Sequence, residues 1–204
     1  MNSRLALHIL QQALNAGVRE FCLAPGKRNA PLVYALAHAK GVKTYYWPEE
    51  RSAAFFALGR IKATDRPVAV VTTSGTAAAE LLPAAMEAYY TQLPLLLITA
   101  DRPRRLRGTG APQCAEQVGL FSYYARYMQD IALSEECQLH KWPQHGPAHL
   151  NICFEEPKEE ECQNLCQEML IDPGVMQKEV KENRWSLALF EEFLNGVHYP
   201  IVVI

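Results

Sequence analysis

The fold class follows from one stretch of the chain, Val68-Ala69-Val70-Val71-Thr72-Thr73-Ser74-Gly75-Thr76. Its first part predicts a strand over 68–72, because a continuous apolar run rich in β-branched residues is typical of a strand buried on both faces of a sheet. The small polar residues that follow indicate a tight turn, and the alanine-rich segment beyond them predicts a helix over 76–90. A buried strand that passes through a turn into a helix is the repeating unit of parallel α/β folds.

The same unit recurs on both sides of this stretch. Apolar runs predict further strands over 20–24, 43–47, 95–99 and 148–154, and helical periodicity predicts helices over 5–14, 32–37 and 51–61. Because the runs lack the alternation of a half-exposed sheet, we expect a doubly wound, mostly parallel sheet with helices on both faces. Ligands bind such sheets beyond the carboxyl ends of the strands.

Composition narrows the functional classes. The 204 residues carry a net charge of -2, from 20 Lys+Arg and 22 Asp+Glu, which argues against wholesale binding of nucleic acid. No apolar run approaches the roughly 18 residues of a membrane span, and the N-terminus lacks the pattern of a signal peptide. We expect a cytoplasmic protein whose partners are small molecules.

Three parts are predicted along the chain. Residues 1–157 form the α/β domain, and the acidic, apolar-poor residues 158–184 predict a linker. Residues 185–204 combine an amphipathic segment with a strand-like run, which suggests the start of a further domain. Since that run has nothing after it to complete a sheet, we expect this sequence to be the front piece of a longer protein.

The six cysteines do not predict a metal site. Cys22 and Cys153 lie in apolar runs, where cysteine is usually a small buried hydrophobic residue. Cys162 and Cys166 are four apart but lack further ligands at zinc-like spacing. Free thiols in a reducing compartment are the better interpretation.

Unusual residues follow four of the predicted strands. Lys27 and Arg28, after the Pro25-Gly26 turn, could hold a carboxylate or phosphate, or could be solvated charges. One of the adjacent Glu49 and Glu50 could cap the next helix, whereas a buried carboxylic acid here could share a proton with a ligand nitrogen.

The other two segments are similarly open to two interpretations. Thr73–Thr76 lacks the lysine of a P-loop, and it could be a ligand-binding turn or an ordinary helix N-cap. The segment 101–107 contains Arg102, Arg104, Arg105 and Arg107, which could bind a substrate with several carboxylates or could be solvated. We expect Arg102, between Asp101 and Pro103, to be ordered.

The order of these motifs resembles a known family. Ala24-Pro25-Gly26-x-Arg28, Glu50-Arg51, Thr73-Ser74-Gly75-Thr76, Asp101-Arg102-Pro103 and Gly110-Ala111-x-Gln113 are similar to the N-terminal pyrimidine-binding domain of thiamine-diphosphate enzymes. The resemblance runs from the first helix to Pro157. Within this superfamily the pattern most resembles the synthases of menaquinone biosynthesis, which decarboxylate 2-oxoglutarate and add the resulting carbanion to isochorismate.

The resemblance implies roles for individual residues. Glu50 would be the catalytic acid that faces N1′ of the aminopyrimidine. The cofactor would be lined by Pro25, Gly26, Glu50, Thr73, Ser74, Gly75 and Thr76. Substrate carboxylates would be held by Lys27, Arg28, Arg102, Arg107 and Gln113.

The resemblance also implies partners outside these residues. The diphosphate and Mg²⁺ would be bound by a domain that this chain lacks, so the piece alone is expected to be inactive. We expect a homodimer or higher homo-oligomer, with the predicted helices 51–61 and 76–90 at the interface.

Departures from the family pattern leave the acceptor substrate open. They are Lys27, Asn29, Glu80 and Pro112. Two alternatives remain for the chain as a whole. One is a pyrimidine-domain subunit of a two-chain thiamine-diphosphate 2-oxoacid decarboxylase, and the other is a non-catalytic assembly module of the same fold.

Overall fold

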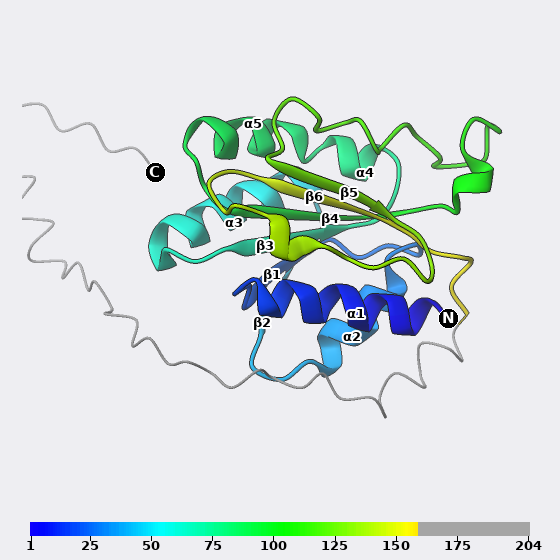
Figure 1. Ribbon diagram of the computed structural model, residues 1–204, viewed down its shortest axis with the longest axis horizontal. Helices are drawn as coiled ribbons and strands as arrows, with labels where there is room; N and C mark the ends of the chain where they lie inside the picture. Colours follow the sequence, from blue (N-terminus) through cyan, green and yellow to red (C-terminus); the bar gives the residue numbers. More distant parts are fainter. Residues whose placement is uncertain (159–204) are drawn as a thin grey trace, which may run out of the picture.

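The computed structural model describes residues 1–158, which form one six-stranded sheet with helices on both faces (Figure 1). All neighbouring strands are parallel, in the order β2-β1-β3-β4-β6-β5. The expected fold class is therefore confirmed, with every strand pair parallel. The strands are β1 (Glu20–Leu23), β2 (Lys43–Tyr46), β3 (Val68–Thr72), β4 (Leu95–Asp101), β5 (Tyr127–Ile131) and β6 (Ala148–Cys153).

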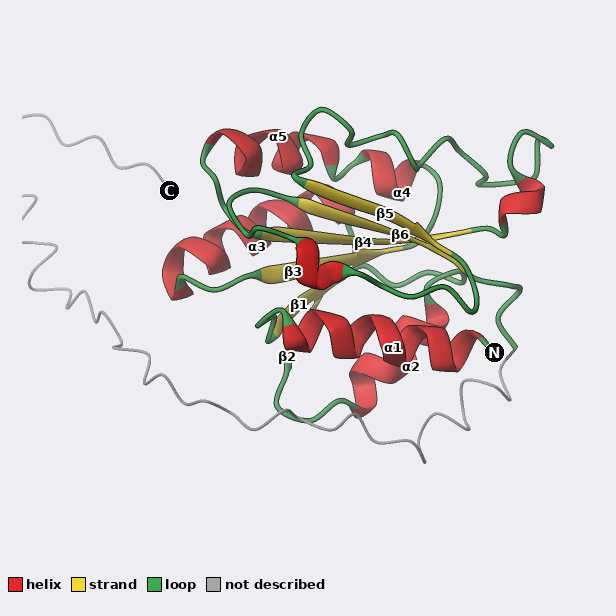
Figure 2. Ribbon diagram, in the orientation of Figure 1, coloured by secondary structure: helices red, strands yellow, loops and turns green. Residues whose placement is uncertain are grey.

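Helices cover the two faces of the sheet unequally (Figure 2). On one face lie α1 (Asn2–Asn15) and α2 (Ala30–His38), and on the other lie α3 (Glu50–Thr64), α4 (Thr76–Ala79) and α5 (Leu82–Tyr90). Two short 3₁₀ helices, η1 (Arg104–Leu106) and η2 (Leu139–Lys141), lie in the connections that flank β5. In the described part of the chain, no helix combines the length and apolar character needed to cross a membrane.

The alternation of side chains along β3 explains the two hydrophobic cores. Ala69 and Val71 pack into the core beneath α1 and α2, whereas Val68 and Val70 pack into the core beneath α3 and α5. All five positions of β3 are buried, as a central parallel strand requires.

Two elements differ from the sequence-based prediction. The helix expected over 76–90 is divided into α4 and α5, and Pro83 lies in the first turn of α5, where its missing N–H costs least. Strand β5 was not predicted, because the polar residues Gln129 and Asp130 interrupt its apolar character. The proposed linker 158–184, beyond its first residue, and the segment 185–204 lie outside the described residues.

Candidate functional site

The carboxyl ends of β2, β1 and β3 lie side by side, so the segments that follow them meet at one edge of the sheet. The Trp47 N–H donates to the Leu23 carbonyl (2.9 Å), and the Ala24 N–H donates to the Val71 carbonyl (3.0 Å). These bonds bring together the residues 24–29, the residues 72–76 and the start of α3. We call this group the turn region.

Asn29 and Gly26 shape the first of these turns. Asn29 is fully buried, and its side-chain Oδ1 accepts a hydrogen bond from the Gly26 N–H (2.7 Å) while its Nδ2 donates to the Ala24 carbonyl (2.9 Å). A Cβ atom added to Gly26 would lie 2.6 Å from the Cβ of Thr73, so only glycine allows this approach. No role for Asn29 was predicted from the sequence, although an asparagine three residues after Pro-Gly is a recognisable turn residue.

The second turn leaves one buried polar atom without a partner. Gly75 has a φ of 82°, which favours glycine, and it precedes the short helix α4. The Ser74 hydroxyl is buried, and no hydrogen-bond partner for its Oγ is found within the described part of the chain. Buried polar groups without partners are rare in folded proteins, so this hydroxyl is available to a ligand.

The structure separates the two adjacent carboxylates at the start of α3. Glu49 is the N-cap, and its side chain accepts hydrogen bonds from the Arg51 N–H (2.9 Å) and the Ser52 N–H (2.7 Å). The bonds from Ser52 lower the pKa of Glu49. Glu50 is half-buried, and among residues 1–158 its carboxylate has no hydrogen bond or ion pair. The capping role therefore belongs to Glu49 and leaves Glu50 free.

The cations that follow Gly26 are already paired. Arg28 is buried, and its guanidinium donates to the Phe154 carbonyl (3.2 Å) and to the Glu156 carboxylate (2.6 Å). Lys27 is exposed and lies 2.6 Å from the same carboxylate. Glu156 thus occupies the position in which the sequence suggested a bound anion.

The loop after β4 carries the remaining predicted residues, Arg102, Arg107 and Gln113, and they lie in different surroundings. The Arg102 side chain is half-buried, and its Nε donates to the Pro112 carbonyl. Gln113 is exposed and has a φ of 56°. Its backbone lies against Gly75, with its Cα 3.4 Å from the position that a Gly75 Cβ would take. Gln113 therefore borders the turn region.

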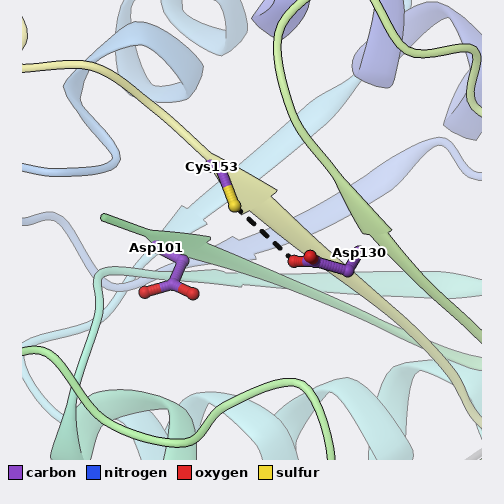
Figure 3. A group of neighbouring side chains, drawn as sticks. All are labelled: Asp101, Asp130 and Cys153. Carbon is purple, nitrogen blue, oxygen red and sulfur yellow. Dashed lines mark hydrogen bonds between the residues drawn. The ribbon is translucent and has the colours of Figure 1, made fainter. Parts of the chain in front are cut away.

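Arg107 instead belongs to a cluster at the ends of β4, β5 and β6, of which Figure 3 shows Asp101, Asp130 and Cys153. Its NH2 group lies 2.6 Å from Asp130, 3.0 Å from Asp101 and 3.1 Å from the sulfur of Cys153. We call these residues, with Asn151, the ion-paired cluster. Burial alone would raise the pKa of Asp130, but hydrogen bonds from Arg107, Asn151 and Arg104 hold it well below its usual range.

The ion-paired cluster does not fit a metal ion. Ligand atoms of Asp101, Asp130 and Cys153 lie within 4.8 Å of one another, and Asp101 is fully buried. However, the Arg107 guanidinium lies among all three and supplies the positive charge. Burial also raises the pKa of the Cys153 thiol to about 12, so the thiol stays protonated.

Buried polar side chains connect this cluster to the turn region. The Asn151 Nδ2 donates to Asp101 (2.9 Å) and Asp130 (2.7 Å), and its Oδ1 accepts from Thr99 (3.1 Å) and Gln117 (2.9 Å). The Thr99 hydroxyl also lies 2.8 Å from the Nε2 of His149, whose pKa is lowered to about 3 by burial. Thr99, His149 and Asn151 were missed because they lie within runs that the sequence marks only as strand, and Gln117 was missed because it lies in the long connection between β4 and β5.

The family model for the thiamine pyrophosphate enzyme N-terminal TPP binding domain matches residues 4–120. The chain belongs to this family. Thiamine pyrophosphate is the same molecule as thiamine diphosphate, so the resemblance drawn from the motifs is confirmed at the level of the family. The matched residues include the turn region, Arg102, Arg107 and Gln113.

Several curated relatives of this chain carry the name 2-succinyl-5-enolpyruvyl-6-hydroxy-3-cyclohexene-1-carboxylate synthase. The chain is 53% identical to the protein of Bdellovibrio bacteriovorus over 160 residues, which cover 76% of this chain and 30% of the relative. It is 50% identical to the protein of Akkermansia muciniphila over 152 residues, or 73% of this chain and 28% of the relative. The chain thus spans less than a third of the length of these relatives.

Proposed function

We propose that this chain supplies the pyrimidine-binding side of a thiamine-diphosphate site in a synthase of the kind its relatives are named for. That synthase would decarboxylate 2-oxoglutarate and add the product carbanion to isochorismate in the cytoplasmic pathway to menaquinone. The observation that carries the proposal is Glu50. It is a half-buried carboxylate that is unpaired within the described chain, at the strand edge where the tight turns meet.

The residues of the turn region fit the cofactor's aminopyrimidine. Glu50 offers a carboxyl for a ring nitrogen, and the buried Ser74 hydroxyl lacks a partner in residues 1–158. Gly26 lies too close to Thr73 to carry a side chain, so Gly26 offers only its backbone to a ligand. We assign contacts with the cofactor to Pro25, Gly26, Glu50, Thr73, Ser74, Gly75 and Thr76.

When bound, thiamine diphosphate supplies the carbon nucleophile and the electron sink for loss of carbon dioxide. The role of Glu50 is to hold a proton between its carboxyl and N1′ of the aminopyrimidine. A carboxyl shares a proton with a weakly basic ring nitrogen best in a dry environment, because water would stabilise the separate carboxylate. Glu50 is only half-buried in this chain, so we assign the closing surface to a second copy.

The same proposal extends to parts beyond residues 1–158. We assign the diphosphate and Mg²⁺ to another domain of the complete synthase, and residues 158–204 to the connection with it. A homodimer or higher homo-oligomer, in contact through α3 and α5, would bring that domain to the turn region. Exposed apolar side chains on these helices, Phe55 (45%) and Tyr90 (68%), support this contact.

Substrate carboxylates require cations that the chain can release. Among the predicted residues, Arg102, whose Nε donates to the Pro112 carbonyl, is the cation that carries no ion pair to a carboxylate within residues 1–158, and the neutral amide of Gln113 borders the turn region. Lys27 and Arg28 would have to exchange Glu156 for the substrate. Arg107 is committed to Asp101 and Asp130, so we give it a structural role beside any contact with substrate.

Exchange of the C2 proton of thiamine diphosphate tests the role of Glu50. In the complete synthase that carries this chain, Glu50→Gln should slow the exchange by about 10²- to 10⁴-fold, the usual contribution of a positioned acid or base. Glu49→Gln is the matched control, since Glu49 bonds only to the start of α3. An unchanged exchange rate in Glu50→Gln would remove Glu50 from the proposed chemistry.

A further inference from the structure

The Gln117 side chain joins three segments that are distant in the sequence. It is 1% exposed, and it comes from the long connection between β4 and β5. Its Oε1 accepts from the Gly75 N–H (2.7 Å), and its Nε2 donates to the Ala100 carbonyl (3.2 Å) and to Asn151 Oδ1 (2.9 Å). No motif in the sequence singles out this residue.

The surroundings of the Gln117 amide permit only one orientation. One end faces a donor, the Gly75 N–H, and the other end faces two acceptors, on Ala100 and Asn151. A reversed amide would place NH₂ against N–H and oxygen against two oxygens. The Gly75 N–H also needs this partner, because N–H groups at the start of a helix have no acceptor within it.

Contacts around Gly75 extend this connection in both directions. The backbone of Gln113 packs against Gly75, four residues before Gln117 on the same loop. On the other side, Asn151 bonds to Asp101 and Asp130 of the ion-paired cluster. The Gln117 side-chain amide therefore links the Gly75 turn, and the loop that carries Gln113, to residues of β4 and β6 by hydrogen bonds.

We propose that Gln117 is a positioning residue that fixes the Thr73–Thr76 turn and the Gln113 loop relative to each other. It contacts no ligand in this scheme and acts through Gly75. The functional meaning rests on the proposed role of this turn in cofactor binding. The structural part, which is the immobilisation of the Gly75 turn by a single amide, is measurable without any ligand.

Two substitutions at Gln117 distinguish the effect of its hydrogen bonds from the effect of its packing in the core. Gln117→Met keeps the approximate volume but removes all three hydrogen bonds. Gln117→Glu keeps the acceptor for the Gly75 N–H, but when ionised it places a negative charge against the two acceptor oxygens. When protonated, it restores one donor. Burial against these oxygens raises the pKa of the introduced carboxyl, so the bonds are present at low pH and lost as pH rises through that pKa.

Hydrogen exchange of the Gly75 amide, followed by NMR on the 204-residue chain, reads out the turn directly. After correction for the intrinsic rate at each pH, Gln117→Met should exchange at least about tenfold faster at Gly75 at every pH, as expected for one lost hydrogen bond. In Gln117→Glu the ionised carboxylate is repelled by the Ala100 and Asn151 oxygens and is displaced from Gly75, so the Gly75 amide should lose protection at high pH and recover it as the pH falls. The amide of Val70 in β3 reports global stability and corrects for it.

Gln113→Glu is the control, because it makes the same substitution at an exposed side chain of the same loop. It should leave the exchange of Gly75 unchanged. Unchanged exchange in both Gln117 variants, or equal acceleration at Gly75 and Val70, would overturn the positioning role. Loss of C2 proton exchange plays no part in this readout, so the result stands apart from the test of Glu50.

The complete synthase provides the functional half of the test. Gln117→Met should raise the thiamine diphosphate concentration that gives half-maximal activity by about tenfold, with a smaller change in kcat at saturation. A fall in kcat alone, with unchanged cofactor dependence, would mean that Gln117 does not position the cofactor turn.

Discussion

The ion-paired cluster and the turn region both lie at the carboxyl ends of the strands, but they differ in whether their polar groups have partners. In the ion-paired cluster, Asp101 and Asp130 are each paired with Arg107 and bonded to Asn151. In the turn region, Glu50 and the Ser74 hydroxyl have no such partners within residues 1–158. Both groups follow parallel strands, yet only one of them is satisfied by the chain itself.

This difference distinguishes a structural role from a binding role. Burying a charge without a partner costs several kcal/mol, so removing one member of an internally paired cluster destabilises the fold, and the paired groups have little to offer a ligand. Buried polar groups without hydrogen-bond partners lower the stability of the fold. Proteins retain them where a bound ligand supplies the missing partner. The ion-paired cluster therefore has mainly a structural role, and the turn region is the better candidate for cofactor binding.

The largest effect is expected from breaking the ion-paired cluster. Arg107→Met would leave Asp101, whose side chain is fully buried, beside Asp130 without the shared cation. We expect a loss of about 3 kcal/mol in the free energy of unfolding, at the lower end for broken buried pairs because Arg107 is partly exposed. Urea denaturation of the chain measures this change.

Arg105→Met is the matched control for that experiment. Arg105 pairs with Glu155 at the exposed surface, with both side chains largely accessible to water. Exposed pairs contribute little, so the urea midpoint should stay at the wild-type value. Equal losses of unfolding free energy in Arg107→Met and Arg105→Met would show that the ion-paired cluster matters no more to stability than an exposed ion pair.

A second prediction concerns the pH dependence of stability. Because the pKa of Asp130 is lower in the folded chain than in the unfolded chain, its contribution is complete above the unfolded pKa and is lost as pH falls towards the folded value. Asp130→Asn should cost about 2 kcal/mol at pH 7, the usual size for hydrogen bonds to a charged group. The difference from wild type should shrink below about pH 4.

Urea midpoints for both proteins between pH 7 and the most acidic pH at which the chain stays soluble give the comparison. Glu135→Gln serves as a control, since Glu135 also pairs with Arg104 but is more exposed than Asp130. A difference between wild type and Asp130→Asn that stays constant with pH would mean that Asp130 is not an ionised group of the cluster.

Much of the fold could be predicted from the sequence because its strands are apolar and lie between clear turns. The prediction for β3, 68–72, has the same bounds as the observed strand. Strand β5 was missed because it is an edge strand with burial on only part of its length. Its pairing with β6 depends on tertiary contacts, which local sequence does not encode.

The candidate site was predictable in its position but not in its partners. Motif order placed Glu50 and Gly75 just after two strands of the sheet, and in the structure they follow β2 and β3, which lie on either side of β1. Spacing alone could not say that Arg107 would pair with Asp130 or that Gln117 would bond to Gly75, because these contacts cross from one strand unit to another. Such partners depend on side-chain placement after the chain has folded.

The smallest change in stability is expected for substitutions at the adjacent residues Glu49 and Glu50. They compare a carboxylate that has partners with one that has none within residues 1–158, both at the start of α3. Glu49→Ala removes the acceptor for two N–H groups at the start of α3, so the urea midpoint should fall slightly. Glu50→Gln removes no contact within residues 1–158, so the midpoint should be unchanged or rise. The opposite result, with Glu50→Gln the less stable variant, would mean that Glu50 is a structural group. It would then lose the freedom that cofactor binding requires.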